Sequence, residues 1–155
     1  TEILGGDTMS EKQYEIRPAV EADLPVIEKL LSDCNLMAVE LAANLKRFLV
    51  AEQAGIIGVI GNEYAGDAVL IRSAAVRSSV RQSGVASALL KQALQQAKQD
   101  GCQTAYLFTN TAATFFANRG FVVVPRTEVP AELLVSPAVT VCCCATAVAM
   151  RRELA

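Results

Sequence analysis

The residues best suited to chemistry form a short polar loop, Arg81-Gln82-Ser83-Gly84-Val85-Ala86, between an apolar run and a helix-forming run. Gly84 and Ala86 carry almost no side chain, so a ligand can approach the backbone closely there. The helix expected to begin here presents N–H groups and the positive end of its dipole to the same space. Arg81 adds a full positive charge. The loop, extended to Ser87, therefore predicts a phosphate or pyrophosphate site, although such residues also occur at ordinary helix starts.

The elements on either side of this loop predict how it is held. Three β-type runs, residues 48–52, 56–61 and 68–76, are separated by glycine-containing turns and indicate an antiparallel meander. After the loop, apolar residues at helical spacing predict a helix over residues 84–100, closed by Gly101. Residues 105–109 then form a strand. Strand, loop, helix and strand make a βαβ unit, whose two strands should be parallel.

The remaining elements are shorter. We expect a strand over residues 14–19 that ends at Pro18, a helix from Asp23, and a second helix over roughly residues 37–45. Towards the other end we expect a helix over 112–118, a strand over 120–124, a loop over 126–137, and a long apolar strand over 139–150 that inserts into the sheet. The fold class is therefore α/β, of the α+β kind.

Composition limits the classes of function. The 155 residues suit one domain, which we place at residues 11–155, with residues 1–10 as a disordered leader or tag. The net charge of −2 gives no basic excess for nucleic acid, and we expect no nucleic-acid partner. The apolar runs are too short to span a membrane, and none resembles a signal peptide. We expect a cytoplasmic protein.

Histidine is absent from the sequence, and cysteine occurs five times. A chain without histidine has neither a Ser-His-Asp nor a Cys-His pair, so protons must move through carboxylates, tyrosine, cysteine, backbone or water. Cys142, Cys143 and Cys144 are consecutive, which is not a disulfide framework. We expect free, packed thiols and no metal site, with thiol-based arsenic binding as an alternative.

With these pieces in order, the chain resembles the GCN5-related N-acetyltransferases (GNAT) from residue 14 to residue 154. Three segments carry the likeness: Ile16-Arg17-Pro18-Ala19 with Asp23-Leu24, the loop Arg81-Gln82-Ser83-Gly84-Val85-Ala86, and Phe115-Phe116-Ala117-Asn118-Arg119-Gly120-Phe121. The resemblance implies a mixed, mostly antiparallel sheet of six to seven strands, flanked by about four helices, with a splayed V between the fourth and fifth strands. It implies acetyl-CoA as cosubstrate, with its pyrophosphate on the loop.

The same resemblance assigns further residues to the cofactor. A main-chain N–H near Ala74, Ala75 or Val76 would polarise the thioester carbonyl. The far side of the cofactor falls to Thr109, Ala112, Phe115 and Phe116. Two positions depart from the family pattern: Thr109 stands where many relatives carry Asn, and Phe116 where many carry a tyrosine acid. Because phenylalanine donates no proton, the CoA thiolate must leave unassisted or be protonated by water or another side chain.

A narrower likeness points to the branch encoded with arsenic-resistance genes. It is carried by Leu70-Ile71-Arg72-Ser73-Ala74-Ala75-Val76, Leu107-Phe108-Thr109-Asn110-Thr111-Ala112, Phe115-Phe116, Arg126-Thr127-Glu128-Val129-Pro130, and a cysteine before Ala147-Val148-Ala149-Met150. In the relatives that cysteine is commonly followed by proline, whereas here Cys143 is followed by Cys144.

Three residues are candidates for the acceptor side. Glu63, at the end of the third strand of the chain (residues 56–61), is the first candidate for the general base, acting through water; otherwise it is a solvated turn residue. Arg72 suits an anionic acceptor or pairs with a structural acid. Because strand residues alternate, only one of Arg72 and Ser73 should line the cleft.

These expectations combine into one function, direct acetyl transfer from acetyl-CoA to the amine of a small molecule, which could be an amino-acid-like toxin. The alternatives are a non-catalytic acyl-CoA-binding or sensing module, and a thiol-based arsenic-binding protein. A homodimer is a further expectation, from the apolar strand near the end of the chain.

Overall fold

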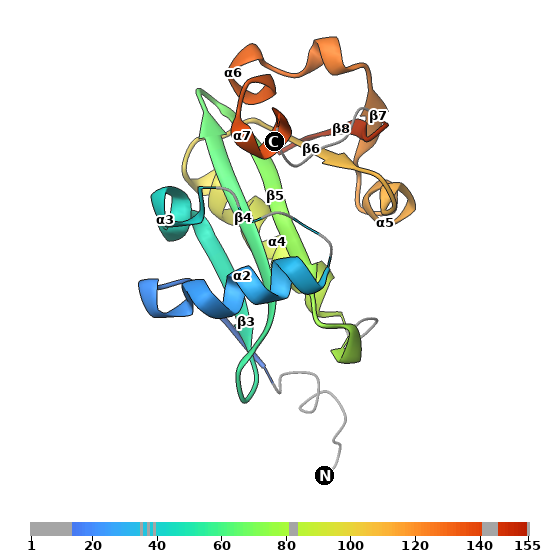
Figure 1. The fold of residues 1–155 in the computed structure, drawn as a ribbon. Coiled ribbons are helices and arrows are strands. Elements are labelled where there is room, and N and C mark those ends of the chain that lie inside the picture. Colours follow the sequence, from blue (N-terminus) through green and yellow to red (C-terminus); the bar gives the residue numbers. More distant parts are fainter. Residues whose placement is uncertain are drawn as a thin grey trace.

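The seven described strands form one sheet in the order β2-β3-β4-β5-β6-β8-β7. The structure is a computed structural model that describes residues 14–34, 36, 38, 40–80, 84–140 and 146–154. The strands are β2 (Glu15–Pro18), β3 (Phe48–Glu52), β4 (Ile56–Ala65), β5 (Ala68–Val76), β6 (Thr104–Thr109), β7 (Val122–Val124) and β8 (Val148–Glu153). Figure 1 shows β6, β7 and β8 turned away from the long β4–β5 hairpin.

The sheet opens between β5 and β6, and this opening positions everything that follows. Among the described strands this is the parallel pair, and its register joins Ala68 to Thr104, Val69 to Ala105 and Leu70 to Tyr106. Beyond these three pairs β5 continues on β4 and β6 continues on β8, so the two strands diverge. The mostly antiparallel sheet, the parallel crossover pair and the V between the two strands are confirmed.

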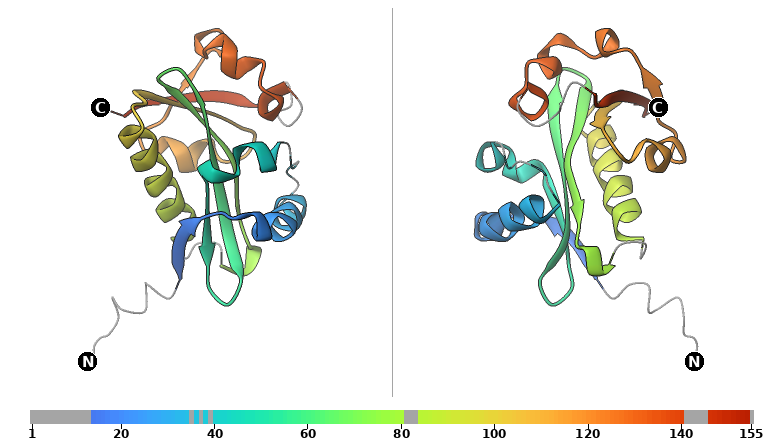
Figure 2. Two further views of the ribbon diagram at one scale, coloured as in Figure 1. Left: turned by 90° about the vertical axis from the view of Figure 1, so that its left-hand side faces the viewer. Right: turned by 45° about the vertical axis from the view of Figure 1, so that its right-hand side comes forward.

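Helices cover both faces of the sheet (Figure 2). One face carries α2 (Leu24–Asp33) and the four-residue α3 (Leu41–Asn44). The side chains of Ile27 and Leu31 on α2 are fully buried. The other carries α4 (Val85–Gln99), which buries Val85, Leu89 and Ala93 at the helical spacing that the sequence predicts. A short helix, α5 (Ala113–Ala117), follows β6.

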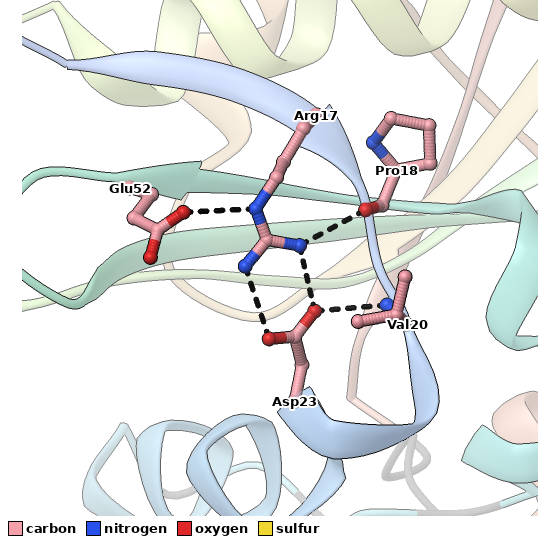
Figure 3. Close-up of polar contacts among 5 residues, drawn as sticks. All are labelled: Arg17, Pro18, Val20, Asp23 and Glu52. Carbon is pink, nitrogen blue, oxygen red and sulfur yellow. Dashed lines mark hydrogen bonds and ion pairs between the residues drawn. The ribbon is translucent and has the colours of Figure 1, made fainter.

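A charged cluster fixes the junction between β2 and α2 (Figure 3). Arg17 donates to both carboxylate oxygens of Asp23, at 2.8 and 3.0 Å, and through Nε to Oε1 of Glu52 at 2.9 Å. Asp23 also accepts the N–H of Val20 at 2.8 Å. The hydrogen bonds from Arg17 hold the pKa of the Asp23 carboxyl below its usual value. This bidentate pair explains why Arg17-Pro18 and Asp23 occur at this spacing.

The chain after β7 differs from the sequence-based expectation. The expected loop contains a 3₁₀ turn at Arg126–Glu128 and the helix α6 (Ala131–Leu134), which follow Pro125 and Pro130. The expected strand over residues 139–150 is wrong in its first part, because α7 (Pro137–Thr140) is helical and β8 begins at Val148. Proline at the first helical position and burial of Val139 in an apolar cluster override the β propensity of this run.

Smaller differences concern element lengths. The expected helix over residues 37–45 is described as α3, and β4 continues through Ala65 before the Gly66 turn. The edge strand β7 begins at Val122, and the side chains of Val122 and Val123 are 60% and 62% exposed. Within the described ranges, no helix combines the length and apolar character needed to cross a membrane.

Candidate active site

A cavity of about 1100 Å³ occupies the V between β5 and β6. Its walls come from β5, the end of β6, the first turns of α4, the helix α5 and the end of α2. Of the predicted cofactor residues, Ala74, Ala75, Val76, Ala86, Thr109, Ala112, Phe115 and Phe116 line it. The fold therefore brings residues that are far apart in the sequence around one space large enough for two small ligands.

The backbone of β5 is irregular where it borders the cavity. Gly61 of β4 faces Arg72, but Val59, two residues earlier, faces Ala75. The extra residue is accommodated by Ser73 and Ala74, which the described ladders pair with no residue of β4 or β6. Ser73 has a φ of +55°, in the left-handed region. This is a β-bulge, which leaves main-chain groups outside the ladder where β5 borders the cavity.

The bulge also decides where two candidate side chains lie. Strict alternation would send Arg72 and Ser73 to opposite faces, but both line the cavity. That expectation is wrong because the positive φ of Ser73 interrupts the two-residue period of the strand. The two side chains also touch, since Nε of Arg72 donates to Oγ of Ser73 at 3.2 Å.

Arg72 is a buried charge in this wall. Its side chain is 4% exposed, and its Nη1 donates to Oε1 of Glu63 at 3.0 Å. The guanidinium also lies over the Phe48 ring, 5.5 Å from its centroid. Glu63 stands on β4 opposite Leu70 and is not among the described residues that line the cavity. The predicted base thus holds the predicted anion-binding arginine and is set back from the acceptor space.

The amino end of α4 lies at one end of this cavity. Gly84 is the N-cap, with a φ of +90°, and a methyl group added to it would meet nothing within 4 Å. Ala86 lines the cavity, whereas Val85 is 2% exposed and packs in the core. Ser87 accepts hydrogen bonds from Nε of Arg119, at 2.8 Å, and from its Nη2. The predicted residues Arg81, Gln82 and Ser83 lie outside the described part of the chain.

The opposite wall is built from the end of β6 and from α5. Oγ1 of Thr109 accepts the N–H of Ala112 at 2.9 Å, which fixes the turn into the helix. The ring of Phe116 meets the rings of Phe115 and Phe121 edge to face, at centroid distances of 5.1 and 5.7 Å. Phe116 is thus both a packing residue and part of the cavity surface.

Sequence reasoning missed three residues near this site. Asp33 and Cys34, at the end of α2, line the cavity, and Sγ of Cys34 lies 3.7 Å from the carbonyl oxygen of Val76. Arg119 links Ser87 to the carbonyl oxygen of Phe115. A lone acid and a lone cysteine at a helix end carry no signal in a sequence, but Arg119 lies inside a recognised segment. The cysteines at 142–144 lie outside the described residues.

The chain resembles known proteins in both sequence and fold. A family model described as acetyltransferase (GNAT) domain matches residues 44–123, which are 80 of the chain's 155 residues. Comparison with curated protein sequences gives no match.

Solved structures with a similar fold are numerous. N-acetylglutamate synthase from Neisseria gonorrhoeae, complexed with coenzyme A and N-acetyl-glutamate, aligns with a TM-score of 0.78 and 21% identity over 92% of this chain and 35% of that one. Rv2747 from Mycobacterium tuberculosis, in complex with CoA, has a TM-score of 0.76 and 22% identity over 91% and 99% of the two chains. The ribosomal-protein-S18-alanine N-acetyltransferase from Escherichia coli aligns with a TM-score of 0.70 and 16% identity, over 92% of this chain and 94% of that one.

At these identities the solved structures establish the fold alone, and this chain spans about a third of the length of the Neisseria synthase. The family rests on the sequence model, which covers β3 to β6 and the start of β7, and with them the bulge, α4 and α5. Because that match extends over more than half of the chain, the protein belongs to the acetyltransferase (GNAT) family, a family of acyltransferases.

Proposed function

We propose that this enzyme acetylates the amine of a small molecule that also carries a carboxylate or similar anionic group, such as an amino acid or an amino-acid-like toxin. The observation that carries the proposal is the placement of Arg72. Its side chain is buried, and Arg72 lines the cavity directly before the bulge where the thioester would lie. A guanidinium in that position complements a planar anion, which would hold the acceptor with its amine toward the acetyl group.

The remaining residues take roles around this pair of substrates. The amides around Gly84 to Ser87, with Arg81, Gln82 and Ser83, hold the diphosphate of acetyl-CoA. The main chain at Ala74 to Val76 polarises the thioester carbonyl. Thr109, Ala112, Phe115 and Phe116 form the opposite wall.

The reaction is a direct transfer. The neutral amine attacks the carbonyl carbon, the C–N bond forms, the C–S bond breaks, and CoA leaves as a thiolate. The ammonium proton passes to water, and the thiolate takes a proton from water, because Phe116 has none to give. Glu63 serves in this scheme as a positioning residue for Arg72, since its carboxylate is committed to the ion pair.

Two likenesses support the acceptor class. The Neisseria synthase structure contains N-acetyl-glutamate, an acetylated amino acid, bound to that protein. The proposed class includes a toxic amino-acid analogue because segments of the sequence resemble the branch encoded with arsenic-resistance genes. We further propose that residues 11–155 form the single catalytic domain and that the enzyme is a homodimer.

The test is the release of free CoA thiol from acetyl-CoA with matched amine pairs that differ in one carboxylate. Alanine against ethylamine, and leucine against 3-methylbutylamine, are suitable pairs, because the second member of each pair carries no anionic group. We expect turnover to favour the carboxylate-bearing member at least tenfold, and Arg72→Met to remove that preference. Equal rates within each pair in the wild type would overturn the proposed acceptor class while leaving acetyl transfer intact.

A further inference from the structure

A second cavity, of about 480 Å³, lies between α4 and the end of β8, outside the site described above. Its floor is apolar, formed by the buried side chains of Leu90, Leu94 and Leu154. Its rim is cationic: Lys91 and Lys98 come from α4, Arg119 follows α5, and Arg152 comes from β8. We call this space, with those four cations, the cationic groove.

The cationic groove is positively charged, although the protein as a whole carries a net negative charge. Four cationic side chains line it against one carboxylate, Glu153, in a chain whose net charge is −2. The ion pairs found in the described part of the chain leave all four unpaired, whereas Glu153 pairs with Arg151. Like charges gathered without counter-charges raise the local positive potential, which is a cost unless an anion binds.

The two arginines are held in place by uncharged groups. Arg119 donates from Nε and Nη2 to Ser87 and from Nη1 to the carbonyl oxygen of Phe115, at 2.9 Å, and its guanidinium stacks 3.7 Å from the Phe115 ring centroid. Arg152 donates to the carbonyl oxygen of Arg119 at 2.9 Å and lies close over Gly120, where a Cβ would come within 3.3 Å of it. These contacts orient both guanidinium groups without neutralising them.

The two lysines extend the rim along the helix. Lys91, Gln95 and Lys98 are at the i, i+4 and i+7 positions of α4 and so share one face. The rise between the two lysines is about 10 Å. Both are exposed, so their ammonium groups reach a ligand without any rearrangement of the core.

We propose that the cationic groove binds a small phosphate-bearing molecule, with its phosphate between the arginines and lysines and its apolar part on the leucine floor. The volume lies in the range of small-ligand sites. Arginine forks match phosphate geometry, and lysines add point charge. The proposal is independent of which amine the enzyme acetylates.

Two sources of that phosphate chemistry are available. Because Ser87, one turn into α4, borders the groove, the 3′-phosphate of coenzyme A itself could reach it from a diphosphate held near Gly84. Alternatively, a separate phosphorylated metabolite occupies the groove beside a bound cosubstrate. The two sources are distinguished by whether a ligand still binds when the cosubstrate site is filled.

The test compares three proteins: the wild type, Lys91→Gln/Lys98→Gln, and the control Lys29→Gln/Lys46→Gln, which removes two exposed lysines elsewhere. In the first arm, KM is measured for acetyl-CoA and for acetyl-3′-dephospho-CoA. In the second, inorganic pyrophosphate is titrated calorimetrically at low salt with saturating CoA present. Two further variants are measured in both arms. Arg152→Lys keeps the positive charge but loses the paired N–H donors of the guanidinium, and Glu153→Gln removes the opposing carboxylate.

If the groove holds the 3′-phosphate, the groove variant raises KM for acetyl-CoA at least fivefold, to the value for the dephospho form, and the control does not. If it holds a separate ligand, pyrophosphate binds the wild type and the control in the presence of CoA, at least fivefold more tightly than the groove variant. In either case Glu153→Gln strengthens binding, and 0.5 M salt weakens it. A groove variant indistinguishable from the control in both arms would overturn the proposal.

Discussion

Arg72 and Glu63 join two neighbouring antiparallel strands through an ion pair of 3.0 Å, and Arg72 alone of the two reaches the cavity surface. A buried arginine needs a carboxylate partner, because an unpaired charge in the interior is costly. In this arrangement Arg72 lines the substrate space, and Glu63 is set back from it. The pair therefore acts as one unit, in which the acid sets the geometry and the arginine meets the ligand.

We predict that Glu63→Gln raises KM for a carboxylate-bearing acceptor about tenfold while kcat and its pH profile change little. Glutamine keeps an oxygen acceptor for Arg72 but loses the charge that fixes it. Steady-state kinetics across pH is the measurement, with Glu52→Gln, in the more exposed pair with Arg17, as the control. A large drop in kcat together with loss of the acidic limb would instead identify Glu63 as the general base.

The positive φ of Ser73 predicts a difference between two substitutions. Ser73→Ala keeps the strained backbone and Ser73→Gly relieves it, so the glycine variant should be more stable than the alanine variant by roughly 1 kcal/mol. Urea denaturation measures this. Ala54→Gly, at a φ of +51° in the hairpin between β3 and β4, should show a similar gain without any effect on activity. Equal stability of the two Ser73 variants would contradict backbone strain at the bulge.

Gly84 and Gly101 provide a matched pair for the proposed diphosphate site. They flank α4 with φ values of +90° and +98°, and at neither would a Cβ meet an atom within 4 Å. Each change to alanine should therefore cost about 1–2 kcal/mol of stability through strain alone. Gly84→Ala should in addition raise KM for acetyl-CoA about tenfold, because its methyl group shields the helix amides. A similar KM for both variants would argue against phosphate binding there.

The Arg17–Asp23 pair predicts a dependence of stability on pH. The pKa of Asp23 in the folded protein is below its value in the unfolded chain, which is about 3.9. Its contribution to the free energy of unfolding is therefore complete above about pH 4 and is lost as the pH falls through the lower, folded pKa. Asp23→Asn should cost about 2 kcal/mol at pH 7 and remove this acid dependence.

Urea titrations between pH 2 and pH 7 check this prediction. Asp33→Asn is the control, because Asp33 pairs with Lys29 on the surface and exposed pairs contribute little. If both variants lose the same stability, the Asp23 pair is not the source of the acid sensitivity.

The sequence predicts those parts of the structure that local patterns determine, and it fails where tertiary packing determines the backbone. The β5–α4–β6 unit was predictable because its periodicity, its Gly84 start and its Gly101 end all agree with the fold. The bulge at Ser73 was not, because a serine in the left-handed region has no distinctive pattern. Nor was α7, where packing of Val139 prevails over a β-type run.

Within the site, residue types and their order predicted which segments come together. Ten of the predicted site residues line one cavity, and they do so because β5 and β6 diverge. Pairing of Arg72 with an unspecified structural acid was one of two interpretations of the sequence. That this acid is Glu63 depends on the strand register, which no local pattern encodes. Asp33 and Cys34 reach the site through the path of α2, a tertiary property.

The seam of three residue pairs between β5 and β6 has a consequence for how such an enzyme changes over time. The angle at which the sheet parts is set at that seam, remote from the reacting groups. Substitutions at Val69 or Ala105, both fully buried there, would alter the width of the opening without touching any surface that a substrate meets. The range of accepted amines could thus change through substitutions between β5 and β6, while the residues that line the cavity stay the same.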